Sequence, residues 1–326
     1  MNKNEIKITK VATGKRRRKM AYESGKITGS AGIHWYRGAD CNFNPNISNF
    51  SEPDAIRDYV LKGWLPDVPF LDKKSSITTF GSCFAIEVAE FLKSRDYNIS
   101  SPKSHSIVDF MAGVNNTFAI RQLVEWVYEG KVLAEETWHK DDKGTVERNE
   151  NQRKRTLKKF KHTDLFIITL GLSEVWYNKE TGDVFWRAIP ENLFDGDLHG
   201  FKVSSFSENK ENIQAIYDII IKNNPNAKIL LTMSPVPLVA TFRPVSCLTA
   251  NSVSKSILRA AIDEFYRDNN GQTNKSLYYW PSYEIVEKIF PQTIQGGPYQ
   301  SDNRHIKRNL VEIIMKSFEE YYVIPT

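Results

Sequence analysis

Short apolar runs alternate with longer amphipathic stretches along most of the chain. The near-continuous apolar runs at 165–170 and 228–233 are typical of central parallel strands that helices cover on both faces. Shorter runs rich in β-branched and aromatic residues, at 76–80 and 276–280, predict two further strands. Strands that alternate with helices in this way predict a mainly parallel sheet between two helical layers.

Helical periodicity, in which apolar residues recur three or four positions apart, fills the intervals between these strands. We expect helices at 84–95, 117–128, 207–222, 252–266 and 306–321. Ser207 is a suitable N-cap for the third helix, and the Asn-Asn-Pro-Asn run at 223–226 ends it. The predicted fold class is therefore α/β, a three-layer α/β/α sandwich with a flavodoxin-like, mainly parallel sheet.

The first 50 residues differ from the rest of the chain. Residues 1–50 are rich in Lys, Gly, Asn and Ser and show little periodicity, so we interpret them as an N-terminal arm. Four apolar residues are expected to pack this arm on the body: Ile33, Trp35, Tyr36 and Phe43. Residues 51–326 are predicted to form one domain, with a short helix at 54–63 and long insertions near 130–162 and 177–204.

Composition and charge fit an ordinary globular protein. The 326 residues are 40% hydrophobic and 25% charged, and the net charge is only +5. Basic clusters at 15–19 and 153–161 are compatible with nucleic acid, an anionic cofactor or an anionic polysaccharide, or are solvated surface. No nucleic-acid-binding module signature accompanies them, which argues against a nucleic-acid partner.

Cysteine usage and the N-terminus indicate a reducing compartment. The three cysteines, Cys41, Cys83 and Cys247, are odd in number and scattered, and no C-x-x-C pair suggests zinc. The basic N-terminus has no apolar core of a signal peptide, and no stretch approaches the roughly 20 apolar residues of a membrane span. We expect a cytoplasmic protein without a membrane span. The histidines lack metal-ligand spacing, and no nucleotide-binding glycine loop is present.

The first candidate for chemistry is a serine at a strand-to-helix break. In Ile77-Thr78-Thr79-Phe80-Gly81-Ser82, the strand breaks at Gly81, and Ser82 starts the next helix. Ligands meet the carboxyl ends of parallel strands, and helix N-termini carry unpaired N–H groups and a positive dipole. An oxyanion would be stabilised there, and Gly81 permits close approach. The alternative is that Ser82 only caps the helix.

The second candidate is an acid three residues before a histidine, Asp302-Asn303-Arg304-His305. In a loop or a first helical turn, this spacing brings the Asp302 and His305 side chains to one side. His305 can then accept the Ser82 proton while Asp302 holds the other imidazole nitrogen. Together the three residues supply a nucleophile, a base and a group that orients the base. The alternative is that Asp302 caps the last helix.

Seven blocks give the chain a family resemblance. Gly81-Ser82-Cys83-Phe84-Ala85 and the final Asp-x-x-His resemble the GSCFA family, an SGNH-like group of bacterial proteins. SGNH- or GDSL-type hydrolases likewise place the nucleophilic serine after the first strand and D-x-x-H near the C-terminus. The other blocks follow in the family's order at 116–122, 170–176, 234–238, 251–260 and 281–284. The resemblance covers roughly residues 70–320.

This resemblance implies roles for the candidate residues. Ser82 is the nucleophile, His305 the general base and Asp302 its orienter. The superfamily builds its oxyanion hole from the serine N–H, a glycine N–H and an asparagine side chain. The glycine would be Gly171, but Gly-Leu-Ser-Glu replaces G-x-N-D, so Ser173 takes the asparagine position.

The replaced asparagine leaves two possibilities for the oxyanion hole. Asn116 is the best substitute amide in the chain. Loss of one donor typically lowers turnover about 10²–10³-fold. The chain therefore has either a substituted hole or weakened catalysis.

Five further residues complete the expected substrate-binding set. Glu174 and Trp176 follow the central strand and should face the same crevice, Glu174 as a polar contact and Trp176 as a sugar-stacking wall or a core aromatic. Lys255 either meets a substrate carboxylate or phosphate or is solvated. The side chain of Cys83 should point elsewhere, although a thiol nucleophile is an alternative. Ser234 is assigned to the same set.

The predicted function is acyl-ester chemistry on a carbohydrate or small-molecule ester through a Ser82 acyl-enzyme. Attack by water makes the protein an esterase or deacetylase, and attack by a sugar hydroxyl makes it an O-acyltransferase. No cofactor is required, but acyl-CoA is a possible donor for a transferase, and the basic 153–161 segment is a candidate for contacting its phosphates. A non-catalytic carbohydrate-binding or scaffold module is the alternative, because fold does not fix function. The altered third block favours this alternative, whereas the intact serine, acid and histidine favour catalysis.

Overall fold

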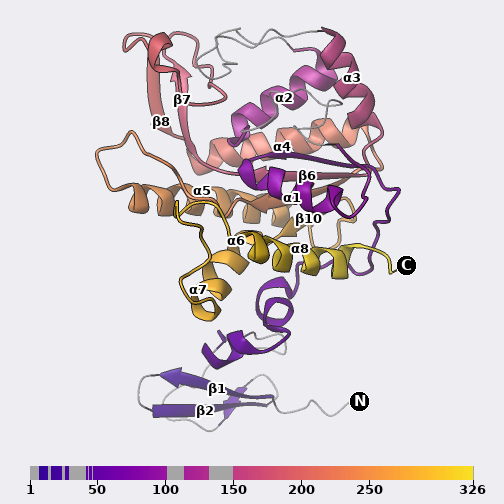
Figure 1. Cartoon of the computed structure of the whole chain (residues 1–326), viewed down its shortest axis with the longest axis vertical. Helices are drawn as coiled ribbons and strands as arrows, with labels where there is room; N and C mark the ends of the chain where they lie inside the picture. The colour runs from indigo at the N-terminus through magenta and orange to yellow at the C-terminus, as the bar shows by residue number, and fades with distance from the viewer. Residues whose placement is uncertain are drawn as a thin grey trace.

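A five-stranded parallel sheet forms the centre of the protein in a computed structural model (Figure 1). The structure describes residues 7–13, 16–23, 26–28, 42, 44–45, 47–100, 114–131 and 150–325. The strand order is β10-β9-β6-β4-β5, and every adjacent pair is parallel. The strands are β4 (Ile77–Gly81), β5 (Ile99–Ser100), β6 (Leu165–Leu170), β9 (Lys228–Met233) and β10 (Leu277–Trp280). This order is the flavodoxin-like one, so the predicted fold class is confirmed.

Helices cover both faces of this sheet. One layer contains α2 (Thr117–Glu129), α3 (Glu150–Lys161), α4 (Phe206–Asn223) and α5 (Cys247–Asp268). The other contains α1 (Cys83–Lys93) and α8 (Arg308–Tyr322), with the short helices α6 (Ser282–Glu284), η7 (Ile285–Ile289) and α7 (Phe290–Thr293). Figure 1 shows α4 and α8 on opposite sides of the sheet. The chain enters β4 after two short helical segments, η1 (Ile47–Ser51) and η2 (Arg57–Leu61).

Alternation along the central strand explains the two layers. On β6, Phe166, Ile168 and Leu170 pack in the core on one face, whereas Leu165 and Ile167 pack in the core on the other. All six residues of β6 are buried, as expected for a parallel strand between helical layers. The strands predicted at 165–170 and 228–233 agree with the structure residue for residue.

Two polar regions contain structure that the sequence pattern did not predict. The insertion expected near 177–204 is bounded by an antiparallel ribbon of β7 (Glu174–Asn178) and β8 (His199–Val203), with a single turn, η6 (Glu191–Leu193), between them. The first insertion holds helix α3 from residue 150 onward. The N-cap of α4 is Ser205 rather than Ser207, because Ser205 and Glu208 bond each other's backbone in a capping box.

The N-terminal region contains a three-stranded antiparallel sheet. Its strands are β1 (Lys7–Thr13), β2 (Arg16–Glu23) and β3 (Lys26–Thr28). Several expectations fall outside the described residues: those for Ile33, Trp35, Tyr36, Phe43, Cys41, the histidines at 34, 105 and 139, and the insertion at 132–149. Among the residues that are described, no helix combines the length and apolar character needed to cross a bilayer.

Gly81 sets the path of the chain from β4 into α1. Its φ of +126° is rarely open to residues with a side chain, and a Cβ there would lie 2.2 Å from the backbone oxygen of Thr169. The glycine therefore brings β4 and β6 close together at their carboxyl ends.

We expect Gly81→Ala to lower the free energy of unfolding by about 4 kcal/mol or more, because backbone strain and a clash with fixed backbone add together. Gly182→Ala is the matched control: its φ is +77°, but a Cβ there meets nothing within 4 Å. The control should lose only about 1–2 kcal/mol. Urea denaturation of both variants measures the difference, and equal losses would contradict this account.

Candidate functional site

Ser82 lies at the carboxyl end of β4 and is the N-cap of α1. Its hydroxyl oxygen accepts a hydrogen bond from the Phe84 N–H at 3.2 Å, and the residue is only 4% exposed. The capping expected from the sequence is therefore present. Capping does not exclude catalysis, because the same position puts the hydroxyl at the edge of the sheet where ligands bind.

Thr169 on β6 is the immediate neighbour of Ser82, and no sequence motif predicted this contact. The two hydroxyl oxygens are 2.9 Å apart. The Ser82 N–H donates to both the hydroxyl oxygen of Thr169, at 2.8 Å, and its backbone oxygen, at 3.0 Å. The backbone donor that the family resemblance assigned to the oxyanion hole is thus engaged by Thr169 in this structure.

Gly171 also lies against the serine. A Cβ built on Gly171 would be 3.4 Å from the Ser82 Cβ and 2.9 Å from the Asn115 Cβ. The N–H groups of Gly171 and Leu172 both donate to the backbone oxygen of Asn115, at 2.7 and 3.2 Å. Asn115 and Ser82 therefore flank the same glycine, and the Gly171 N–H is already hydrogen bonded.

A buried lysine holds this part of the backbone in place. Lys255 on α5 is 2% exposed, and its Nζ donates to the backbone oxygens of Gly171 at 2.8 Å, Ser234 at 2.7 Å and Val236 at 2.8 Å. An ammonium has three donors, and here all three are used. Burial lowers the pKa of Lys255 to about 7, against an opposing effect of the Glu287 charge. The expectation that Lys255 contacts a substrate carboxylate or phosphate is therefore not met.

Asp302 and His305 form a pre-oriented pair. The distance from His305 Nδ1 to Asp302 Oδ2 is 2.5 Å, and Asp302 Oδ1 accepts from the backbone N–H groups of Arg304 and His305, both at 3.0 Å. The hydrogen bond from His305, followed by the two backbone bonds, lowers the pKa of Asp302 to about 2. Asp302 thus stays ionised at neutral pH and fixes the imidazole.

The loop that carries this pair lies at the same edge of the sheet as Ser82. A bridge between Tyr299 and Ile306 closes the loop. The Tyr299 hydroxyl donates to Glu287 Oε1 at 2.5 Å, and its oxygen lies 3.2 Å from the backbone oxygen of Pro235, just past the end of β9. In the described part of the chain, no hydrogen bond joins His305 to Ser82 and none involves Nε2 of His305. The serine and the base thus share an edge of the sheet without a hydrogen bond between them.

Two of the expected binding residues have structural partners. Asn116 caps α2 by accepting from the Ala119 N–H at 2.8 Å, and its amide nitrogen donates to Trp186. Ser173 is fully buried, with its hydroxyl 3.3 Å from that of Ser254. Both side chains are therefore held by contacts within the protein.

The remaining expected residues divide between buried and exposed positions. Ser234 is fully buried, and its hydroxyl accepts from the Val236 N–H. Cys83 is exposed on the first turn of α1. Glu174 is 7% exposed and accepts from the Thr241 hydroxyl at 3.1 Å, while Trp176 packs among aromatic rings of the β7–β8 ribbon and the loop after β9.

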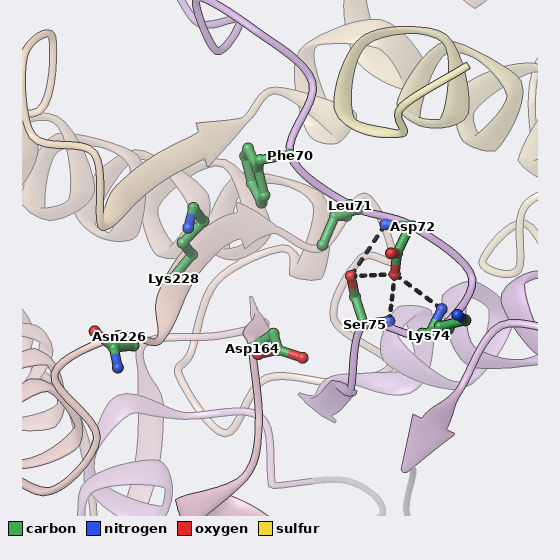
Figure 2. A pocket seen from close by; sticks show the side chains of 8 residues that line it. All are labelled: Phe70, Leu71, Asp72, Lys74, Ser75, Asp164, Asn226 and Lys228. Atoms are coloured by element: carbon green, nitrogen blue, oxygen red, sulfur yellow. Dashed lines mark hydrogen bonds between the residues drawn. The ribbon is translucent and has the colours of Figure 1, made fainter. Parts of the chain in front are cut away.

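A cavity of about 330 Å³ lies elsewhere, at the opposite, amino-terminal edge of the sheet (Figure 2). Asp164, which precedes β6, and Lys228, which starts β9, are part of its wall; the other lining residues are Phe70, Leu71, Asp72, Lys74, Ser75 and Asn226. Asp72 and Asp164 both bond nearby backbone N–H groups. This cavity is therefore separate from the candidate site.

The GSCFA family model matches residues 76–318. Comparison with curated proteins gives no match. Among solved structures, the chain is similar to a carbohydrate esterase family 3 protein from Talaromyces cellulolyticus, with 10% identity, a TM-score of 0.37, and coverage of 76% of this chain and 95% of that chain. A family two carbohydrate esterase from Clostridium thermocellum is 11% identical, with a TM-score of 0.35 and coverage of 77% of this chain and 64% of that chain. A salicylyl-acyltransferase from a tetracycline biosynthetic pathway is 12% identical, with a TM-score of 0.36 and coverage of 77% of this chain and 55% of that chain. Because these TM-scores are low, the fold assignment rests on the sheet topology.

The buried Lys255 predicts a pH dependence of stability. Its pKa is about 7 in the folded protein and near the ordinary 10.5 in the unfolded chain. Between these values the unfolded chain binds a proton that the folded chain does not, so this group makes the free energy of unfolding rise with pH. The stability of the wild type relative to Lys255→Met should therefore increase by up to about 1.4 kcal/mol per pH unit from pH 7 to 10.

Denaturant titrations at four pH values measure this difference. Lys154→Met, at an exposed position on α3, is the control, and its difference from the wild type should stay constant with pH. Parallel pH curves for the wild type and Lys255→Met would contradict the assigned shift.

Proposed function

Since the chain belongs to the GSCFA family, we propose that it is an SGNH-type serine enzyme that transfers acyl groups through an ester on Ser82. The observation that carries the proposal is the Asp302–His305 pair, which lies at the carboxyl edge of the sheet with Nδ1 held by the carboxylate. Nε2 is then the nitrogen that can accept a proton. Ser82 lies at the same edge, at the N-terminus of α1, and its hydroxyl is the proposed source of that proton.

The proposed reaction needs only these three residues and a substrate. The Ser82 hydroxyl exchanges Thr169 for His305 as its partner and loses its proton to Nε2 as Oγ bonds the acyl carbon. The bond from that carbon to the leaving alcohol, or to the thiol of an acyl-CoA, then breaks, and His305 returns the proton to the leaving atom. Asp302 stabilises the imidazolium that forms between these steps.

We propose that the oxyanion is bound by the Asn115 side-chain amide and the Cys83 N–H. Asn115 and Ser82 both have their Cβ atoms beside Gly171, whereas the Asn116 side chain caps α2 and bonds Trp186. Cys83 is the first residue of α1, where a backbone N–H has no intrahelical acceptor. This pair would replace the N–H groups of Ser82 and Gly171. The first is bonded to Thr169 and the second to the backbone oxygen of Asn115.

Hydrolysis and transfer share this first half-reaction. Water attacking the Ser82 ester makes the protein an esterase or deacetylase, and a sugar or other small-molecule hydroxyl makes it an O-acyltransferase. For a transferase, acyl-CoA is the proposed donor class. The lysines in the last turn of α3, expected to contact its phosphates, end just before Asp164 at the opposite edge of the sheet, so that expectation is not kept. No cofactor enters either route.

The second candidate is a non-catalytic carbohydrate-binding or scaffold module. The engagement of the Ser82 and Gly171 N–H groups within the protein favours it, because neither backbone donor implied by the family resemblance is available in this structure. Chemical labelling separates the two candidates.

A fluorophosphonate probe should form one covalent adduct on Ser82, detected by intact mass and peptide mapping. Ser82→Ala and His305→Gln should abolish labelling, and Asp302→Asn should slow it by roughly 10²-fold or more, because the imidazole loses its orientation. Asp72→Asn is the matched control, since Asp72 also bonds nearby backbone N–H groups but lies at the opposite edge of the sheet. An unlabelled wild type would favour the binding module.

Neighbouring asparagines should behave differently when each is replaced by alanine. Asn115→Ala should lower the labelling rate, and turnover of any ester substrate, by about 10–10³-fold with little change in stability. Asn116→Ala should instead lower the free energy of unfolding by about 1 kcal/mol, because α2 loses its N-cap. Equal effects on turnover would remove Asn115 from the proposed oxyanion hole.

A further inference from the structure

Buried polar atoms without partners gather beside the candidate site. In the described part of the chain seven buried side-chain polar atoms have no hydrogen-bond partner, and three of them are Glu174 Oε2, Trp176 Nε1 and Arg243 Nη1. A fourth, Arg304 Nε, is adjacent in sequence to His305. Such atoms are few in folded proteins, and each calls for an explanation.

The first three atoms belong to one cluster. Arg243 Nη1 lies 3.9 Å from Glu174 Oε1, beyond hydrogen-bond distance, and that oxygen is held instead by the Thr241 hydroxyl at 3.1 Å. The Trp176 ring packs against Phe242, the residue before Arg243, with 4.8 Å between ring centroids. The cluster thus offers one acceptor and two donors, all unused, from β7 and the loop after β9.

Aromatic rings border these atoms and reach the surface. The Trp176 centroid is 5.6 Å from that of Phe194 and 5.3 Å from that of Phe201. Phe194 is 50% exposed and Phe242 is 57% exposed. The unpartnered atoms themselves are buried, so a ligand that lies on these rings reaches them when the partly exposed Arg243 side chain moves aside.

A short stretch of backbone joins the cluster to Gly171, which lies beside Ser82. Glu174 follows Gly171, the glycine beside Ser82, by three residues, which span at most about 11 Å. The loop that holds Thr241 and Arg243 leaves the carboxyl end of β9, where Lys255 fixes its first residues. A substrate with its ester at Ser82 can extend into this region.

We propose that Glu174, Trp176 and Arg243, with the rings of Phe194 and Phe242, form the subsite for a sugar residue of the substrate or acceptor. This inference rests on the proposed acyl transfer at Ser82 and names the class of molecule that it serves. A ring hydroxyl donates to Glu174 Oε2 and accepts from Trp176 Nε1 or Arg243 Nη1, so it satisfies both kinds of unpartnered atom. The Arg243 side chain is 30% exposed, so it can change its position when a ligand binds.

Charge and chemistry select a neutral polyol over other ligands. One carboxylate and one guanidinium face each other, so the subsite has no net charge to favour a phosphate or a carboxylate. An acyl chain would cover the aromatic rings but leave all three polar atoms unpaired, which costs free energy. The C–H face of a sugar packs on aromatic rings, and its hydroxyls pair with the polar atoms.

Two esters test the subsite. The first is mono-acetylated methyl glucoside, and the second is 4-nitrophenyl acetate, which has no hydroxyl. Trp176→Phe, which removes only the indole N–H, and Glu174→Gln should each lower kcat/KM for the acetylated glucoside about 3- to 10-fold, mainly through KM. Phe242→Ser should lower it about tenfold. All three should leave 4-nitrophenyl acetate turnover and fluorophosphonate labelling of Ser82 within twofold of the wild type.

Controls and a binding measurement keep the inference separate from the proposed function. Trp64→Phe and Ile313→Ser, which lie outside the cluster, should change neither ester. Saturation-transfer NMR with methyl glucoside, galactoside and mannoside should show sugar binding by the wild type that is lost in Phe242→Ser, even if Ser82 proves unreactive. Equal losses on both esters, or sugar binding that is absent or unchanged by the variants, would overturn the subsite.

Discussion

The three hydrogen bonds of Lys255 hold the functional edge of this protein together. One ammonium joins the backbone after β6, at Gly171, to the backbone after β9, at Ser234 and Val236. Gly171 lies against Ser82. Pro235, the residue after Ser234, has its backbone oxygen 3.2 Å from the hydroxyl of Tyr299, which belongs to the Asp302–His305 loop. A single buried side chain therefore links the nucleophile's side of the site to the base's side. An apolar residue of the same length would leave these three carbonyls, two of them buried, without this donor, which offsets the cost of desolvating a lysine here.

The fold could be predicted because its main signals are local. The runs at 165–170 and 228–233 are apolar throughout, since both faces of a central parallel strand are covered, and the structure has strands at those residues. The β7–β8 ribbon was not predicted, because it is a two-stranded element outside the main sheet and its strands carry mixed polar and aromatic residues. The N-terminal strands were missed for the same reason: their basic, polar sequences have no apolar periodicity.

The candidate site could be predicted only in part. Contacts between residues close in sequence were predicted, and contacts between distant residues were not. Asp302 and His305 are three residues apart, so their pairing follows from a local spacing. Thr169 is 87 residues from Ser82 and Lys255 is 84 residues from Gly171, and no local pattern reveals these contacts. Asn115 and Asn116 are adjacent asparagines, and only the start of α2 shows which of them is committed to capping.

The closed loop between Tyr299 and Ile306 has a consequence for the order in which the molecule assembles. Its aspartate–histidine contact spans three positions and costs little loop-closure entropy, so it can form while most of the chain is still unfolded. The contact of Ser82 with Thr169 spans 87 positions and requires β4 and β6 to be paired in register. Contacts of such long range form late in folding. The base and its orienter can thus pair before the tertiary structure forms, whereas the nucleophile meets Thr169 only when β4 and β6 have paired.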